Sequence, residues 1–365
     1  MGDSAERPKY EFVDINVSGE GAVRTAFANQ VAYCEHNGAP ITARVVAAIW
    51  AAIDAGLDNA LARRIVEWQG PPLADALPLR VAGGIHALHL SGTEPALSPI
   101  YRGIGADDAG ILSEVMRAHE APLMPWLDGP PQTNEAGRSS NFIAAMLWLA
   151  RQGLPGRFEC LEIGSSAGIN LMLERYRYDL GGVEIGPDDP AMRFTPDWKG
   201  PQPPDEPIAI VSTRGCDLHP VDLTDPTQAL RLKAYIWPEH TVRFERMEAA
   251  IRAASERKPD LVEANAADFI EAELAKPQAQ GTTRLLMHSI VWQYVPEDQQ
   301  ARITAAMEAA GAEATADRPL AWVSVEADRT VHRHMLKVRY WPGGRAATQL
   351  AWSHAHGADI EWIAG

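Results

Sequence analysis

The 365-residue sequence is short of cysteine and of long apolar runs. Its three cysteines, Cys34, Cys160 and Cys216, form no CxxC pair, which argues against a zinc knuckle or a disulfide framework and favours a reducing cytoplasm. The longest aliphatic stretch, VVAAIWAAI at 45–53, is too short to span a bilayer. Residues 1–12 have no basic start followed by an apolar run, so no signal peptide is expected. These absences predict a cytoplasmic protein without a membrane partner.

Basic residues are also scarce relative to acidic ones. Lys and Arg number 33 against 48 Asp and Glu, which leaves a formal net charge of −15. Because Lys and Arg supply much of the affinity for phosphate backbones, this balance argues against a nucleic-acid partner. The chain is well supplied with apolar residues, at 46%, and its length suggests about two domains.

The pattern of apolar residues changes near Gly156. Before it, Ala-rich segments with apolar residues at three and four spacing predict helices. After it, short β-rich runs alternate with helical ones, which predicts a parallel sheet covered on both faces. The run RYDLGGVEIG at 177–186 predicts a hairpin, and the runs at 334–363 predict antiparallel strands at the sheet edge. We therefore predict an all-helical domain, 1–138, and an α/β domain, 139–365, with a hairpin insertion at about 174–207.

The segment CLEIGSSAGINL at 160–171 predicts a strand, a glycine turn and a helix. Several ligand classes bind such a turn, because a helix N-terminus offers free N–H groups and glycine lets a ligand approach the backbone. A dinucleotide fingerprint would need glycine at 164, 166 and 169 and finds only the first, and the Gly-Lys of a P-loop is missing. Two interpretations remain. Ser166 is the nucleophile in the G-x-S-x-G elbow of a serine hydrolase, or it replaces the middle glycine in the turn of a class I S-adenosylmethionine (SAM) methyltransferase.

Acidic and polar residues follow the predicted strands. Glu162 favours the methyltransferase interpretation, because in a hydrolase its carboxylate would be buried without a partner. Asp217 follows the second strand and Asp268 the third, although such residues are often helix caps or turn residues. His288 and Ser289 end the fourth strand, where His288 is either a general base or a structural histidine.

Five strings carry a resemblance to a bacterial family of domains of unknown function over almost the full length, and its members contain a class I SAM-dependent methyltransferase core. They are QTNEAGRS (132–139), LEIGSSAGINL (161–171), RGCDLHPVDLTDP (214–226), YIWPEH (235–240) and HSIVWQYVP (288–296). The resemblance implies an α/β fold with a Rossmann-like methyltransferase sheet. It also implies SAM as cofactor, bound by Glu162, Gly164, Ser165, Ser166, Gly168, Asp217 for the ribose, Asp268 for the adenine and Ser289.

The polar run QTNEAGRS precedes an apolar helix and is interpreted as pocket lining. We predict catalytic roles for Glu135 and Arg138, although they could also form a local ion pair at i and i+3. Substrate contacts are predicted for Gln132, Asn134, Trp292 and Tyr294. No Asn/Asp-Pro-Pro-Tyr tetrapeptide is present, which disfavours DNA adenine and glutamine as acceptors.

Histidines occur in closely spaced pairs, including His332 and His334. No Cys or acidic ligand accompanies them at a familiar spacing, so no metal is expected.

These observations together predict a SAM-dependent methyltransferase. Its substrate would be a small molecule held between the helical cap and the Rossmann-like domain. Two alternatives stay open: a SAM-binding or degenerate protein of the same fold without transfer activity, and a serine hydrolase using Ser166. The sequence carries no signal for the oligomeric state.

Overall fold

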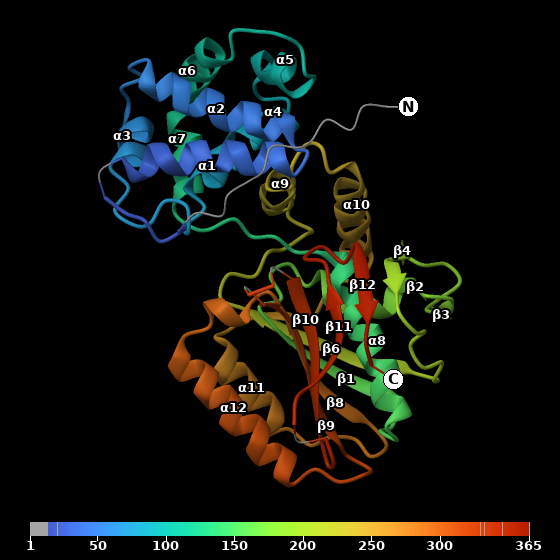
Figure 1. Cartoon of the computed structure of the whole chain (residues 1–365). Helices are drawn as coiled ribbons and strands as arrows, with labels where there is room; N and C mark the ends of the chain where they lie inside the picture. Colours follow the sequence, from blue (N-terminus) through green and yellow to red (C-terminus); the bar gives the residue numbers. More distant parts are fainter. Residues whose placement is uncertain (1–13, 20, 329, 332, 345, 365) are drawn as a thin grey trace. The chain divides into compact units, whose positions relative to one another are not determined.

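A computed structural model describes residues 14–19, 21–328, 330–331, 333–344 and 346–364. The segment 1–12, for which no signal peptide is expected, and His332 lie outside these described residues. The chain divides into two compact units (Figure 1). One comprises the chain up to Thr133 together with Pro226–Glu245, and the other Asn134–Asp225 together with Arg246–Gly365. None of the described helices has the length and apolar character needed to cross a membrane.

The division differs from the predicted domains in one long segment. Pro226–Glu245 was expected in the α/β domain but groups with the helical unit. Its helix α9 packs on α4 through a small apolar cluster that includes Trp126 and Tyr235. The sequence-based boundary at 138/139 did not account for this return of the chain, because burial against a distant helix leaves no local signal.

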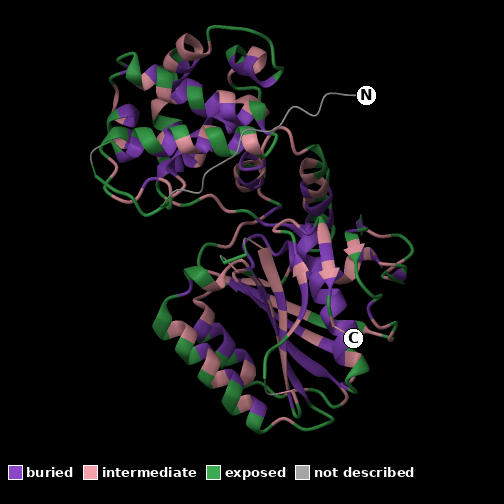
Figure 2. Cartoon of the chain, in the orientation of Figure 1, coloured by how far each residue is buried: buried purple, intermediate pink, exposed green. Residues whose placement is uncertain are grey.

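The helical unit is built around an apolar core, and its described residues include no strand. Inward-facing residues such as Ile49, Leu61 and Ile85 are fully buried, as the apolar spacing predicts (Figure 2). Its α-helices are α1 (Ala22–His36), α2 (Pro40–Asp54), α3 (Ala60–Val66), α4 (Leu77–Leu90), α5 (Ser98–Tyr101), α6 (Asp108–Ala118), α7 (Glu120–Leu123) and α9 (Pro226–Ala234). Helix α10 (Thr241–Glu256) carries residues of both units.

The second unit contains a nine-stranded sheet in the order β5-β12-β11-β10-β9-β8-β1-β6-β7. Five strands are parallel: β1 (Arg157–Ile163), β6 (Ala209–Asp217), β7 (Leu261–Glu263), β8 (Thr283–Ser289) and β9 (Leu320–Asp328). Three more continue it in antiparallel fashion: β10 (Arg333–Trp341), β11 (Thr348–Ser353) and β12 (Asp359–Trp362). A mixed α/β fold with a largely parallel sheet and an antiparallel C-terminal part is therefore confirmed.

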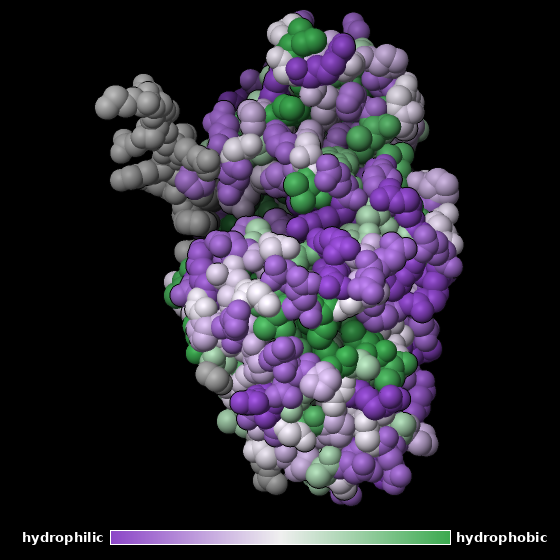
Figure 3. Space-filling view, turned by 90° about the vertical axis from the view of Figure 1, so that its right-hand side faces the viewer, coloured by the Kyte–Doolittle hydropathy of each residue, from purple (hydrophilic) through white to green (hydrophobic). Residues whose placement is uncertain are grey.

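Helices cover both faces of this sheet (Figure 1). On one face, α11 (Ala266–Leu274) and α12 (Glu297–Ala312) pack on Leu161, Ile163 and Leu286. On the other face lies α8 (Ser139–Arg151), which contacts β9 and β10. Because successive residues of a strand point to opposite faces, Glu162 points away from α11 and α12. On the side seen in Figure 3, the surface of this unit is mainly hydrophilic around one apolar patch.

The insertion after β1 forms a second, three-stranded sheet of β2 (Tyr176–Leu180), β3 (Val183–Ile185) and β4 (Met192–Phe194). The segment predicted as a hairpin forms β2 and β3, joined by Gly181 and Gly182, which both have positive φ. Strand β5 (Asp197–Lys199) was not predicted; it pairs in parallel with β12 and forms the edge strand of the large sheet.

Candidate functional site

The strand order reverses between β1 and β8. From β1 the chain adds β6 and β7 on one side and then places β8 and β9 on the other side of β1. In open α/β sheets, ligands bind in the crevice at the carboxyl ends of the strands where the order reverses. The loops that follow β1 and β8 are therefore the candidate site.

The loop after β1 is a tight turn that depends on glycine. Gly164 has φ +65°, and a Cβ atom there would lie 2.2 Å from Val291 Cγ2 of the loop after β8. Gly168 has φ +69°, and its Cβ would lie 2.9 Å from Pro259. Glycine is needed at both positions because a side chain would be strained and would clash. The two loops of the reversal point thus contact each other directly.

Each of these loops also holds a non-glycine residue in the left-handed region. Ser166 has φ +52°, and Ile290, directly after β8, has φ +53°. A β-branched residue such as Ile rarely adopts this conformation, which costs of order 1–3 kcal/mol. Backbone strain of this kind concentrates at functional sites, and both residues flank the same reversal point.

Glu162 is the buried acid of the site, with 2% of its surface exposed. Its Oε1 accepts a hydrogen bond from Asn170 Nδ2 at 3.0 Å, and its Oε2 has no partner among the described residues. Burial raises the pKa of the Glu162 carboxyl to about 7, although the side chains of Asn170 and Ser165 and the Arg138 charge lower it. The carboxyl is therefore balanced between its neutral and ionised forms near neutral pH.

Five buried polar atoms around the turn and at the start of α8 have no hydrogen-bond partner among the described residues. They are Ser140 Oγ, Asn141 Oδ1, Glu162 Oε2, Ser166 Oγ and Asn170 Oδ1. Unsatisfied buried groups are uncommon, and a cluster of them indicates a place for a ligand or water. Three of the five are oxygens that only accept, unless Glu162 is protonated, so a fitting ligand brings hydrogen-bond donors or positive charge.

Asp217 ends β6 and holds the turn. Its Oδ2 accepts the Ser166 N–H at 2.8 Å and its Oδ1 accepts the His219 N–H at 2.9 Å. Ser165 is fixed in turn by its own N–H, which donates to the Cys216 carbonyl at 3.0 Å. Asp217, the residue predicted to bind the ribose, thus lies at the glycine turn. Both of its carboxylate oxygens accept hydrogen bonds from backbone N–H groups.

The polar run before α8 also reaches the turn. Asn134 Oδ1 accepts the N–H of Ile169 at 3.0 Å, and Arg138 Nε donates to the Ala355 carbonyl at 2.7 Å. Glu135 and Arg138 are both buried, and Glu135 Oε1 lies 3.8 Å from His356 Nδ1. Asn134, Glu135 and Arg138 therefore belong to the surroundings of the site, whereas Gln132 is part of the helical unit.

Two residues of the predicted site, Asp268 and Tyr294, lie outside the glycine turn and its surroundings. Asp268 lies on the first turn of α11 with its side chain 59% exposed, where it pairs with Arg302 at 2.7 Å and contacts Asn265. No hydrogen bond or ion pair described in the structure connects it to the turn, and Asn265, the N-cap that follows β7, stands nearer the strand end. Tyr294 is 73% exposed and directs its ring to solvent. Ser289 is buried at the end of β8.

His288 lies on the opposite face of the sheet from Glu162, because it shares the face of Leu286. Its Nε2 accepts the indole N–H of Trp322 at 2.9 Å, and its Nδ1 lies 2.7 Å from Glu326 Oε1. An indole nitrogen only donates, so Nε2 carries no proton and Nδ1–H donates to Glu326. Both ring nitrogens are engaged, so the geometry does not support the predicted role of His288 as general base.

The sequence reasoning missed four residues that organise this region: Asn170, Val291, Trp322 and Glu326. Asn170 stands inside the glycine-turn string and could have been found as the amide nearest Glu162. Glu326 carried no usable signal, because one acid in the strand-like run LAWVSVEA looks like a surface residue.

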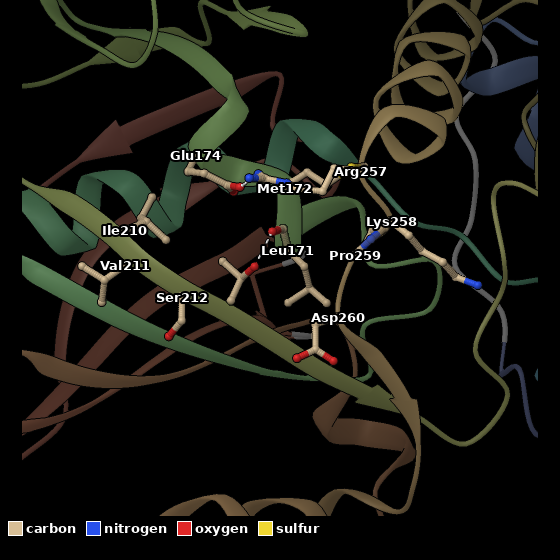
Figure 4. A pocket seen from close by; sticks show the side chains of 11 residues that line it. Leu171, Met172, Glu174, Ile210, Val211, Ser212, Arg257, Lys258, Pro259 and Asp260 are labelled. Atoms are coloured by element: carbon tan, nitrogen blue, oxygen red, sulfur yellow. Dashed lines mark hydrogen bonds and ion pairs between the residues drawn. The ribbon is translucent and has the colours of Figure 1, made fainter. Parts of the chain in front are cut away.

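A cavity of about 290 Å³ lies along β6 and the end of α10 (Figure 4). Its charged residues are already paired, with Arg257 on Glu174, Lys258 on Asp222 and Asp260 on Arg214. It therefore offers no unpaired charge to select a ligand. Within the described part of the chain, no group of three or more His, Cys, Asp and Glu residues could hold a metal ion.

Comparison with known proteins places these features in a family. No curated protein and no solved structure gives a significant match to the chain. A family model with the description "uncharacterized protein conserved in bacteria (DUF2332)" matches residues 24–362. The match includes the glycine turn, Glu162, Asp217 and both loops of the reversal point. The chain therefore belongs to this bacterial DUF2332 family.

Proposed function

We propose that the α/β unit binds SAM at the reversal point of its sheet and transfers the methyl group to a small molecule. The observation that carries this proposal is the buried carboxyl of Glu162 beside the glycine turn, with one oxygen unpartnered among the described residues. An ionised carboxylate in such a place is costly unless a cation compensates it. SAM brings two cationic groups, a sulfonium and an ammonium.

The chemistry of the site also disfavours nucleotides with phosphate groups. A phosphate would need donors at the turn, but the unpartnered amide and carboxyl oxygens of Asn141, Glu162 and Asn170 are acceptors. The charge of Glu162 would also repel a phosphate. These groups suit an ammonium group.

Methyl transfer from a sulfonium is an in-line displacement, and the bound cofactor supplies the electrophilic methyl group. The protein contributes mainly binding and orientation. Glu162 and Asn170 would hold the amino acid part, while Asp217 keeps the turn closed through the Ser166 N–H. Arg138 stabilises the ionised form of Glu162 through its nearby positive charge.

Binding without transfer is the second candidate function. It is favoured by the hydrogen bonds of His288, which leave both ring nitrogens occupied and the site without the base predicted at this position. An acceptor that ionises readily needs no such base, so the two candidates differ in the acceptor they require.

Calorimetric titration tests the cofactor directly. We expect SAM and S-adenosylhomocysteine to bind the full chain with a stoichiometry of one, because both carry the ammonium group that Glu162 would accept. Adenosine, which has neither the ammonium group nor a phosphate, serves as the control for nucleoside binding alone and should bind at least about tenfold more weakly. Absence of heat from both SAM and S-adenosylhomocysteine would remove the basis of the proposal.

A fluorophosphonate probe tests the hydrolase alternative. We expect no labelling of Ser166, because its hydroxyl has no hydrogen-bond partner among the described residues and hence no imidazole to activate it. Mass spectrometry of the treated protein gives the readout, and Ser166→Ala is the matched control. Stoichiometric labelling that this variant loses would favour a serine hydrolase over the methyltransferase.

A further inference from the structure

A second cavity, of about 280 Å³, opens on the face of the sheet that carries α12. It lies beside His288 and is bordered by Trp292, Trp322, Glu326 and Lys337. Glu162 points to the opposite face, so this cavity is separate from the cluster of unpartnered atoms around the glycine turn. Its volume is near the lower end of the range for ligand pockets, roughly 300–1,000 Å³, and suits a small molecule.

The aromatic wall of the cavity is held rigidly. Trp292 and Trp322 pack edge to face with ring centroids 5.4 Å apart, and His288 stacks on Trp292 at 5.2 Å. The hydrogen bonds of His288 to Trp322 and Glu326 fix the rings in place. A preformed aromatic wall binds an apolar or cationic group without an ordering cost.

Three charged residues border the same cavity. Arg339 pairs with Glu308 at 3.2 Å, whereas Glu326 and Lys337 form no ion pair with each other. Glu326 uses Oε1 for His288 and for the N–H groups of Val291 and Trp292, and none of the described contacts uses its Oε2. Lys337 forms no ion pair within the described part of the chain. The strand register pairs Glu326 with Met335 and Ser324 with Lys337, so the two charged residues are diagonal neighbours on one face.

The loop after β8 borders both the cavity and the glycine turn. Val291 occupies the space that a side chain at Gly164 would need, and Trp292 lines the cavity. The N–H groups of these two residues lie 3.2 and 3.3 Å from Glu326 Oε1. A ligand of the cavity would therefore lie next to the loop that closes the proposed cofactor site.

We propose that this cavity binds a small zwitterion with an apolar body, whose ammonium group faces Glu326 and the tryptophans and whose carboxylate faces Lys337. This binding goes beyond the proposed function and does not rest on it, because the cavity lies on the opposite face of the sheet from Glu162. The second oxygen of Glu326 and the ammonium group of Lys337 select a ligand that carries both charges, and the aromatic wall selects its apolar part.

Three matched probes test this proposal on the full chain: L-phenylalanine, phenethylamine and 3-phenylpropionate. They share the phenyl ring and differ in which charged groups they carry. Intrinsic tryptophan fluorescence is the readout, with Trp292→Phe to identify the signal. We expect L-phenylalanine to bind at least tenfold more tightly than either probe with one charge. Equal affinity for the three probes, or no binding of L-phenylalanine, would overturn the proposal.

Two variants separate the charges. Lys337→Met should lower the affinity for L-phenylalanine to that for phenethylamine, and Glu326→Gln should lower it to that for 3-phenylpropionate, while keeping an acceptor for His288. Lys199→Met on β5, at the edge of the sheet, is the control and should bind as the wild type does. Unchanged affinity in both cavity variants would contradict the proposal, and the probe series on the wild type decides the matter if a variant does not fold.

The same titrations with and without S-adenosylhomocysteine separate the two proposals. Binding of L-phenylalanine by a protein that binds neither SAM nor S-adenosylhomocysteine would retain the zwitterion pocket and reject the proposed function. Binding of S-adenosylhomocysteine without L-phenylalanine would retain the proposed function and reject the pocket.

Discussion

Replacing Glu162 by Gln should make the free protein more stable at pH 8 and weaken its binding of S-adenosylhomocysteine by at least about tenfold. The carboxyl is buried with one oxygen unpartnered among the described residues, so its ionised form is costly in the free protein. Gln keeps an acceptor for the Asn170 amide and removes the charge. The residue that we assign to the cation thus lowers stability until the cation is bound.

The pH dependence follows from the raised pKa of Glu162. Its value is about 7 in the folded chain against 4.5 for an ordinary Glu. Between these values the folded state holds a proton that the unfolded state has lost, so this carboxyl makes stability fall as pH rises from about 4.5 to 7. The variant lacks this dependence. Its advantage should be near zero at pH 4 and reach on the order of 3 kcal/mol above pH 7 to 8.

Chemical denaturation at pH 5 and pH 8 measures this difference. Glu313→Gln, at an exposed carboxyl after α12, is the control and should leave the difference between the two pH values unchanged. If the difference in unfolding free energy between Glu162→Gln and the wild type were the same at both pH values, the buried carboxyl would not be the source of the pH dependence.

Ligand binding gives the complementary signature. A cation that binds the ionised carboxyl displaces its proton, so the affinity of the wild type for S-adenosylhomocysteine should rise with pH up to about 7 and then level off. Calorimetry in buffers of different ionisation enthalpy should detect the proton release below pH 7, and Glu162→Gln should lose it.

The second large effect is expected from Gly164→Ala, which should destabilise the fold by about 3 kcal/mol or more. Part of this is the left-handed backbone, which costs alanine about 1 kcal/mol. The larger part is the clash of the new Cβ with Val291, whose Cγ2 lies 2.2 Å from the Cβ position. Relief of the clash would push the loop after β8 away from the turn.

Gly281→Ala is a matched control for the backbone term. Gly281 has φ +66°, nearly that of Gly164, and its Cβ would meet no atom within 4 Å. This variant should lose only about 1 kcal/mol. The double variant Gly164→Ala with Val291→Ala should recover part of the loss, with a coupling of at least about 1 kcal/mol in a double-mutant cycle. Equal losses in Gly164→Ala and Gly281→Ala would show that the two loops do not press on each other.

The local elements of the fold could be predicted from the sequence because their signals are local. Alternation of β-rich and helical runs indicated the parallel strands, and the absence of helical runs near the end indicated the antiparallel ones. The glycine turn was visible for the same reason, since Gly164 and Gly168 stand where the backbone needs positive φ.

The neighbours of each side chain were decided only by the tertiary structure. Asp268 looks like a ligand after a strand, but the direction of α11 turns it toward Arg302 and solvent. His288 looks like a base, but the register of β8 and β9 brings Glu326 and Trp322 to its two nitrogens. The return of Pro226–Glu245 to the helical unit and the pairing of β5 with β12 are long-range in the same way.

The sequence by itself determined the elements and the glycine turn, because backbone conformation and apolar periodicity depend on residues close in the chain. The tertiary structure decided which polar groups are buried together and which charges stay unpaired. Burial depends on strand order and on which helix covers which face. Burial raises the pKa of Glu162, and its second oxygen has no partner among the described residues.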